Sequence, residues 1–222
     1  MAPLKKKKTK VQNLAQPLVS TQVKEELKNG FKFTTKEGIN ILTYPADYLK
    51  LKVDCLVSPA NKDLKPSKGF GQDIAQAAGR QVEKECEDLM AEKGDLAVGA
   101  CCSTIAGNLP YHCIIHTISP TWLLYGDQKK KCLEDLRGAI VSALHKANSH
   151  GHKTVAFTSI GTGVYGVPKP FCAMQYYKGV EEYGKHMDKG DNSLQEVHFI
   201  DPDEGMFQTL HKTFSKYLGE GK

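Results

Sequence analysis

The chain has 222 residues, of which 40% are hydrophobic and 25% charged, and its formal net charge is +5. These values are ordinary for a globular protein with a sizeable core, and the length allows one large domain or two small ones. No apolar run approaches the roughly 18–20 residues that cross a bilayer, so the sequence predicts no membrane span. No apolar segment follows the first lysines, so it predicts no signal peptide either.

The first 20 residues form a basic tail that we expect to be disordered. Much of the positive charge lies in Lys5, Lys6, Lys7, Lys8 and Lys10. Without them the rest of the chain is nearly neutral. Such a run is typical of a nuclear-import signal, of a nonspecific nucleic-acid contact or simply of a solvated tail. Because nothing in the middle resembles a linker, we expect one domain over residues 21–218 and a short tail over 219–222.

The first predicted elements are three strands and a helix. Residues 31–34 alternate apolar and polar, and with 39–44 they predict paired strands at a sheet edge. The nearly continuous apolar run at 53–58 is typical of a strand that is covered on both faces. From 71 to 93, apolar residues recur every three or four positions, which predicts one amphipathic helix.

Strands and helices continue to alternate in the rest of the chain. Strands at 98–102 and 112–116 flank a turn at 107–110, which predicts a hairpin-like connection. The later predicted elements are a helix over 129–149, a strand over 154–159, a helix after Pro168, a strand over 197–200 and a last helix through Met206, Leu210 and Phe214. This order predicts an α/β fold, a three-layer α/β/α sandwich around a mixed, mostly parallel sheet, with ligands beyond the carboxyl ends of its central strands.

Two loops that follow buried strands are the candidate binding segments. The second, 159–166, has three glycines in six positions, which permits positive φ and lets backbone N–H groups converge on a phosphate. It has no Gly-Lys-Ser/Thr, which excludes a P-loop NTPase. In the first loop, 58–71, the Asn61 side chain can both donate and accept hydrogen bonds, as a sugar diol requires. The alternatives are a glycine loop that only turns a corner and an Asn that closes a turn on its own backbone.

The seven cysteines are odd in number, and Cys55, Cys101, Cys102 and Cys113 lie inside apolar runs. Disulfide frameworks use loop positions, so we interpret the cysteines as buried free thiols in a reducing compartment, the nucleus or the cytoplasm. The cysteines and histidines show no closely spaced ligand pairs of the zinc type. The sequence therefore predicts no metal.

Three segments, in order along the chain, match the motifs of a known family. Residues 46–61, Ala-Asp-Tyr-Leu-Lys-Leu-Lys-Val-Asp-Cys-Leu-Val-Ser-Pro-Ala-Asn, are similar to a Gly-Asp-Ile-Thr segment that runs into Val-Asp-Ala-Ile-Val-Asn-Ala-Ala-Asn. Residues 113–122 look like an Ile-His-Xaa-Val-Gly-Pro-Xaa-Trp strand, and residues 159–168 look like the phosphate loop. Over residues 30–217 the chain resembles the macro-domain family, closest in character to macro domains of poly(ADP-ribose) polymerase-type proteins.

The resemblance implies a cleft that binds ADP-ribose without a metal or cofactor. Asp47, followed by Tyr48, would accept a hydrogen bond from the adenine amino group and select adenine over guanine. Asn61 would hold the distal ribose, and the Tyr165 ring would cover the ribose. The other implied ligand residues, whose loops would close over the ligand and cradle its diphosphate, are Gly69, Phe70, Gly71, Ser159, Gly161, Thr162, Gly163 and Val164.

The resemblance also favours a reader of mono-ADP-ribosylated proteins over an enzyme that removes the group. Hydrolytic relatives commonly carry a carboxylate after the first loop's glycine run or an Asp in the second loop, where this chain has Gly71 and Tyr165. Asp73, the weak catalytic candidate, lies early in a helix, where acids more often complement the dipole than catalyse. An ADP-ribosyl hydrolase that uses Asp73 and a nucleic-acid binder that uses the lysine tail are the alternatives.

Four further positions bear on this interpretation. His116 has a side chain that titrates near neutrality, but it lies in an apolar strand at a position that the family uses structurally, so we interpret it as structural. Trp122 is interpreted as packing. The chain departs from the family at Ser58, in place of an Asn, and around 200–202, where many relatives place an aromatic that stacks on adenine. We therefore expect a modest affinity.

Overall fold

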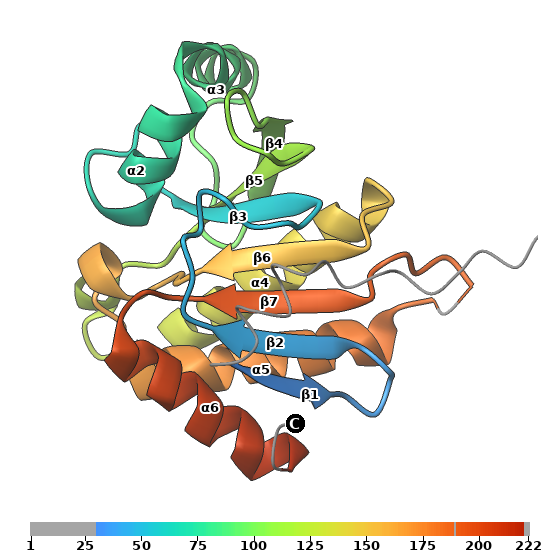
Figure 1. Cartoon of the computed structure of the whole chain (residues 1–222). Helices are drawn as coiled ribbons and strands as arrows, with labels where there is room; N and C mark the ends of the chain where they lie inside the picture. Colours follow the sequence, from blue (N-terminus) through green and yellow to red (C-terminus); the bar gives the residue numbers. More distant parts are fainter. Residues whose placement is uncertain (1–29, 189, 220–222) are drawn as a thin grey trace, which may run out of the picture.

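The computed structural model describes residues 30–188 and 190–219, which build a seven-stranded sheet with helices on both faces (Figure 1). The basic tail expected over 1–20 lies outside these residues. So do residues 21–29 of the expected domain and the last three residues of the expected tail. In the part of the chain that is described, no helix combines the length and the apolar character needed to cross a membrane.

The sheet is mixed and mostly parallel, as predicted. Its strands are β1 (Phe31–Thr34), β2 (Asn40–Tyr44), β3 (Cys55–Ala60), β4 (Cys101–Ile105), β5 (Cys113–Ile118), β6 (Thr154–Thr158) and β7 (Glu196–Ile200), in the spatial order β1-β2-β7-β6-β3-β5-β4. The five inner strands run parallel, whereas β1 and β4 at the edges run antiparallel to their neighbours. The carboxyl ends of the inner strands therefore share one edge of the sheet.

Helices cover both faces of the sheet and complete the three layers. They are α2 (Gly69–Ala78), α3 (Arg80–Lys93), α4 (Lys129–Ser149), α5 (Lys169–His186) and α6 (Glu204–Leu218), with short 3-10 turns η2 (Trp122–Tyr125) and η3 (Gly163–Tyr165). One hydrophobic core packs α4, α5 and α6 against the sheet, and a second packs α2 and α3 against the opposite face. Every residue of β3 is buried, as expected for a central strand between two helical layers.

The prediction of one helix over 71–93 is wrong, because the chain breaks at Gly79 into α2 and α3. Gly79 has φ +88° and ψ 178°, a conformation that is almost restricted to glycine. The Ala78 carbonyl accepts the Asn108 N–H of the β4–β5 turn at 3.0 Å, so this turn occupies the break. Ala78 and Val82, on either side of the break, are both buried, so the apolar spacing continues across it. The periodicity alone therefore could not reveal the break.

Candidate functional site

The two candidate loops lie side by side at the carboxyl edge of the sheet. They follow β3 and β6, which are paired parallel strands. Between the loops is a cavity of about 300 Å³. Of the predicted ligand residues, the cavity is lined by Asn61, Gly69, Phe70, Gly71, Ser159, Thr162, Gly163, Val164 and Tyr165. The residues of the two sequence motifs therefore line one cavity.

Three predicted ligand residues do not line this cavity: Asp47, Tyr48 and Gly161. The Tyr48 hydroxyl donates to Asp73 Oδ2 at 2.9 Å, and its ring meets that of Phe70 edge-on, with the ring centroids 5.0 Å apart. Because Asp73 and Phe70 both line the cavity, Tyr48 supports the cavity wall from behind.

Asp47 lies on the exposed segment that follows β2. Its carboxylate accepts the Leu49 N–H at 3.0 Å and pairs with Lys50 Nζ at 3.0 Å. The Leu49 hydrogen bond and the nearby Lys50 ammonium hold the pKa of Asp47 below its ordinary value. The side chain is therefore an ionised hydrogen-bond acceptor at neutral pH.

Asn61 lines the cavity and also closes the turn of its own loop. Its Nδ2 donates to the Lys65 carbonyl at 2.9 Å, so it closes the turn of its own loop as the alternative interpretation expected. Its Oδ1 is buried and has no hydrogen-bond partner among the described residues. A buried acceptor without a partner is costly, which makes this oxygen a candidate ligand contact.

The glycine-rich loop forms the opposite wall of the cavity. Gly161 and Gly163 have positive φ, as predicted, and the Val167 N–H donates to the Gly161 carbonyl at 2.8 Å, which closes the loop. The short turn η3 occupies the middle of the loop, and the first N–H groups of such a turn have no partner within it. Burial raises the pKa of Tyr165 to about 12, so its hydroxyl stays protonated at neutral pH.

A buried carboxylate that the sequence motifs did not indicate holds the base of this loop. The Ser159 hydroxyl donates to Asp201 Oδ2, and Asp201 Oδ1 accepts the Asp203 N–H at 2.7 Å. Burial raises the pKa of Asp201 above its ordinary value. Ser159 and Asp201 each follow a strand, β6 and β7, whose last residues pair, so strand pairing was the signal that would have linked them.

Gly71 packs α2 so closely against β3 that the position has no room for a side chain. A Cβ atom there would lie 2.6 Å from the Pro59 carbonyl oxygen and 3.2 Å from Pro66 Cβ. A carboxylate at this position would displace the first loop or α2. Asp73, two residues later, is exposed and lines the cavity, where it accepts the Tyr48 hydrogen bond.

A second cavity, of about 490 Å³, lies between the first loop, α2, α3 and β5. The acidic residues Asp63, Glu83 and Glu87 line it together with Lys65, so its walls disfavour an anionic ligand. His116 also lines it, buried in β5 with Nε2 2.9 Å from Thr104 Oγ1. Burial lowers the pKa of His116 to about 4, so the ring is neutral at physiological pH. The smaller cavity is therefore the better anion site.

The macro-domain family model matches residues 57–175, more than half of the chain. Among curated relatives, the human mono-ADP-ribosyltransferase PARP14 is 29% identical over 75% of this chain, and the O-acetyl-ADP-ribose deacetylase of Escherichia fergusonii is 34% identical over 67%. The chain spans 9% of the length of PARP14 but 81% of that of the deacetylase.

Solved structures agree on the fold. A macrodomain of Oceanobacillus iheyensis with MES bound superposes with a TM-score of 0.76 at 22% identity and covers 84% of this chain and 96% of its own. The predicted fold class is thereby confirmed. The family-model match over more than half of the chain shows that the chain belongs to the macro-domain family, and the fold agrees with it.

Proposed function

We propose that this protein binds ADP-ribose in the 300 Å³ cavity and reads it on mono-ADP-ribosylated proteins. One observation carries the proposal. Asn61, whose buried Oδ1 has no partner among the described residues, lines the same cavity as the glycine-rich loop. An acceptor for a sugar hydroxyl thus stands beside backbone donors for a phosphate.

In this proposal each part of the ligand has its own contacts. The distal ribose lies at Asn61, and the diphosphate lies against the backbone N–H groups around η3, near the amino terminus of α5, where the helix dipole favours an anion. The adenosine extends out of the cavity toward Asp47, whose carboxylate accepts from the adenine amino group. The Tyr165 ring covers the ribose.

The names of relatives support this ligand. PARP14 is named as a mono-ADP-ribosyltransferase, and the bacterial relatives are named for O-acetyl-ADP-ribose. Macrodomains of Oceanobacillus iheyensis and Trypanosoma brucei, which share the fold, were solved with ADPR and in complex with ADP-ribose. All of these names contain the same chemical group, ADP-ribose.

Calorimetric titration with ADP-ribose tests the proposal. Wild type should bind one ligand, and Asn61→Ala should bind at least about tenfold more weakly, about 1.4 kcal/mol. Asn40→Ala is the matched control, because Asn40 lies at the opposite edge of the sheet, at the start of β2. No heat with wild type, or equal affinity in Asn61→Ala, would sink the proposal.

A second candidate function is hydrolysis of the ADP-ribosyl bond with the help of Asp73. It is favoured by one observation, that the Asp73 carboxylate lines the cavity and is held by the Tyr48 hydroxyl. The Escherichia fergusonii relative is named as a deacetylase of an ADP-ribose ester. A protein labelled with mono-ADP-ribose on acidic residues separates the two functions: retention of the label fits the reader, and loss that Asp73→Asn abolishes fits the enzyme.

A further inference from the structure

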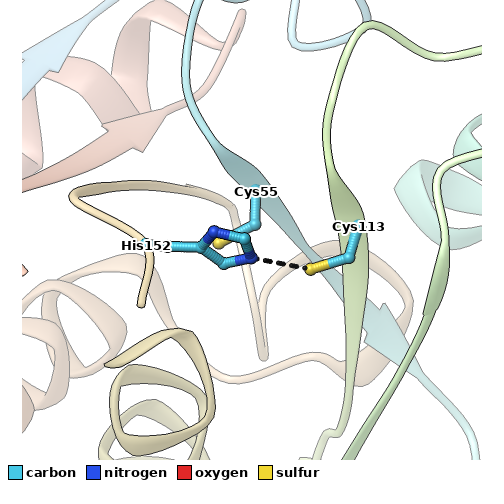
Figure 2. Close-up of side chains that lie close together, drawn as sticks. All are labelled: Cys55, Cys113 and His152. Atoms are coloured by element: carbon cyan, nitrogen blue, oxygen red, sulfur yellow. Dashed lines mark hydrogen bonds between the residues drawn. The ribbon is translucent and has the colours of Figure 1, made fainter. Parts of the chain in front are cut away.

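Three metal-ligating side chains meet at the amino edge of the sheet, at the opposite ends of the strands from the cavity. Cys55 begins β3, Cys113 begins β5, and His152 lies just before β6 (Figure 2). Their sulfur and nitrogen ligand atoms all lie within 4.8 Å of one another, and Cys113 Sγ is 3.3 Å from His152 Nε2. Figure 2 shows both thiol groups directed toward the imidazole.

Sequence spacing gave no sign of this cluster, because its members lie far apart along the chain. The sheet brings them together: β6, β3 and β5 are neighbours, and Cys55 pairs directly with Cys113. The interpretation of the cysteines as buried free thiols did not include this arrangement, which only the strand order reveals.

The chemistry of the three groups fits a borderline-soft divalent cation. Thiolate sulfur lies about 2.3 Å and imidazole nitrogen about 2.0–2.1 Å from a tetrahedral Zn²⁺, which sets the two ligand atoms roughly 3.5 Å apart. The Cys113 to His152 separation of 3.3 Å is close to this value. We propose that Cys55, Cys113 and His152 form a Zn²⁺ site.

The protein holds these groups in place with hydrogen bonds of its own. Asp54 Oδ2 accepts the Lys153 N–H at 2.6 Å and the Thr154 N–H at 3.0 Å, which ties the turn that carries His152 to the start of β3. Ser193 Oγ donates to the His152 carbonyl at 2.8 Å. Supports of this kind fix the backbone that carries His152 before the metal arrives.

In the proposed site, water or a neighbouring imidazole would take the fourth coordination position. The ring centroids of His150 and His112 lie 5.7 and 5.6 Å from that of His152, and both residues are exposed. Cys55 is fully buried and Cys113 is half-buried, so a cation enters from the histidine side. A site with three protein ligands and one exchangeable position is a known zinc arrangement.

A titration of the reduced full-length protein with Co²⁺ tests the site. Co²⁺ replaces Zn²⁺ and absorbs strongly in the near ultraviolet when thiolates bind it. Wild type should develop this band and visible tetrahedral bands with about one equivalent of Co²⁺, and binding should release up to about two protons from the thiols. Zn²⁺ should then displace Co²⁺ and abolish the bands.

Matched variants decide whether these residues are the ligands. Cys113→Ser and His152→Gln should lose the near-ultraviolet band or weaken Co²⁺ binding at least about tenfold. Cys101→Ser, a half-buried thiol of β4, and His186→Gln, an exposed imidazole of α5, should bind like wild type. No band in fully reduced wild type, or bands that persist in both cluster variants, would overturn the proposal.

A measurement on wild type alone covers the case in which a variant fails to fold. Alkylation followed by peptide mass spectrometry should show that Zn²⁺ slows modification of Cys113 but not of Cys101. Equal rates with and without Zn²⁺ would count against the site. A Cys55–Cys113 disulfide in freshly purified protein, with no Co²⁺ binding after reduction, would identify a redox pair instead.

The cluster and the cavity are independent predictions. Cys55 and Ala60 begin and end β3, so the two sites lie roughly 16 Å apart at 3.3 Å per residue. We expect the ADP-ribose affinity to be the same, within about twofold, with and without Zn²⁺. Failure of the zinc site would therefore leave the proposed ADP-ribose site untouched.

Discussion

At the carboxyl end of β3, Asn61 serves both the fold and the proposed ligand. Its Nδ2 bonds to the Lys65 carbonyl and fixes the loop, and this bond orients Oδ1, which has no partner among the described residues. The turn-closing interpretation and the ligand-binding interpretation are thus compatible.

Asp47 should determine the choice of base. Its pKa is lowered by the Leu49 N–H and by Lys50, so it is a carboxylate at neutral pH. In the proposed complex it would accept from the adenine amino group, whereas the guanine carbonyl has no proton to donate. We expect wild type to prefer ADP-ribose over GDP-ribose and Asp47→Ala to lose about tenfold of this preference, about 1.4 kcal/mol. Competition calorimetry with the two ligands measures this preference.

The control for Asp47 is Asp88→Ala on α3, another exposed carboxylate that pairs with a lysine. It should keep the full preference for adenine. An equal preference in Asp47→Ala and wild type would remove Asp47 from the proposed site.

The buried His116 should make the protein less stable in mild acid. Burial lowers the pKa of its ring from 6.5 to about 4, so between these values the unfolded chain binds a proton that the folded chain does not. The contribution of His116 to stability is complete above pH 6.5 and falls as the pH decreases, by about 3 kcal/mol at pH 4. Urea unfolding at several pH values measures this loss.

His116→Gln should flatten this pH dependence because it removes the titrating group and keeps a polar partner for Thr104. The exposed His186→Gln should leave it unchanged. If the free energy of unfolding decreased equally between pH 6.5 and 4 in His116→Gln and in wild type, the ring would not control acid stability.

At the scale of elements, the break between α2 and α3 depends on Gly79. Alanine there would have to adopt φ +88°, and its Cβ would lie 2.7 Å from Asn108 Nδ2. We expect Gly79→Ala to lower the free energy of unfolding by about 1–3 kcal/mol. Urea denaturation monitored by circular dichroism measures the change.

Gly138→Ala in α4 provides the comparison, because an added Cβ there meets nothing within 4 Å. In a helix this substitution should be neutral or stabilising, by up to about 1 kcal/mol. If Gly79→Ala were as stable as wild type, the two helices would not depend on that glycine.

Apart from the break at Gly79, the order and type of the strands and long helices could be predicted from apolar patterns. The sandwich could be predicted too, because α/β alternation leaves few arrangements. Element ends were harder: β4 was predicted at 98–102 and lies at Cys101–Ile105, since alternation marks a strand but not where pairing begins. The two loops of the cavity could be predicted because motifs mark them. The Ser159–Asp201 contact could not, because it depends on which strands become neighbours.

At the scale of the whole molecule, one parallel sheet presents different chemistry at its two edges. Its carboxyl edge carries the Asn61 acceptor and the glycine-rich loop, and its amino edge carries the Cys55, Cys113 and His152 cluster. Both follow from the same topology, because parallel strands place all their ends at common edges. The carboxyl edge also borders two cavities, of about 300 and 490 Å³, and only the smaller contacts the glycine-rich loop.

A crystal structure of the complex with ADP-ribose tests the central claim most directly. The proposal predicts the diphosphate against the backbone N–H groups of Thr162, Gly163 and Val164 and the distal ribose within hydrogen-bond distance of Asn61 Oδ1. Ligand in the acidic cavity beside His116, or a diphosphate that makes no contact with the glycine-rich loop, would contradict it.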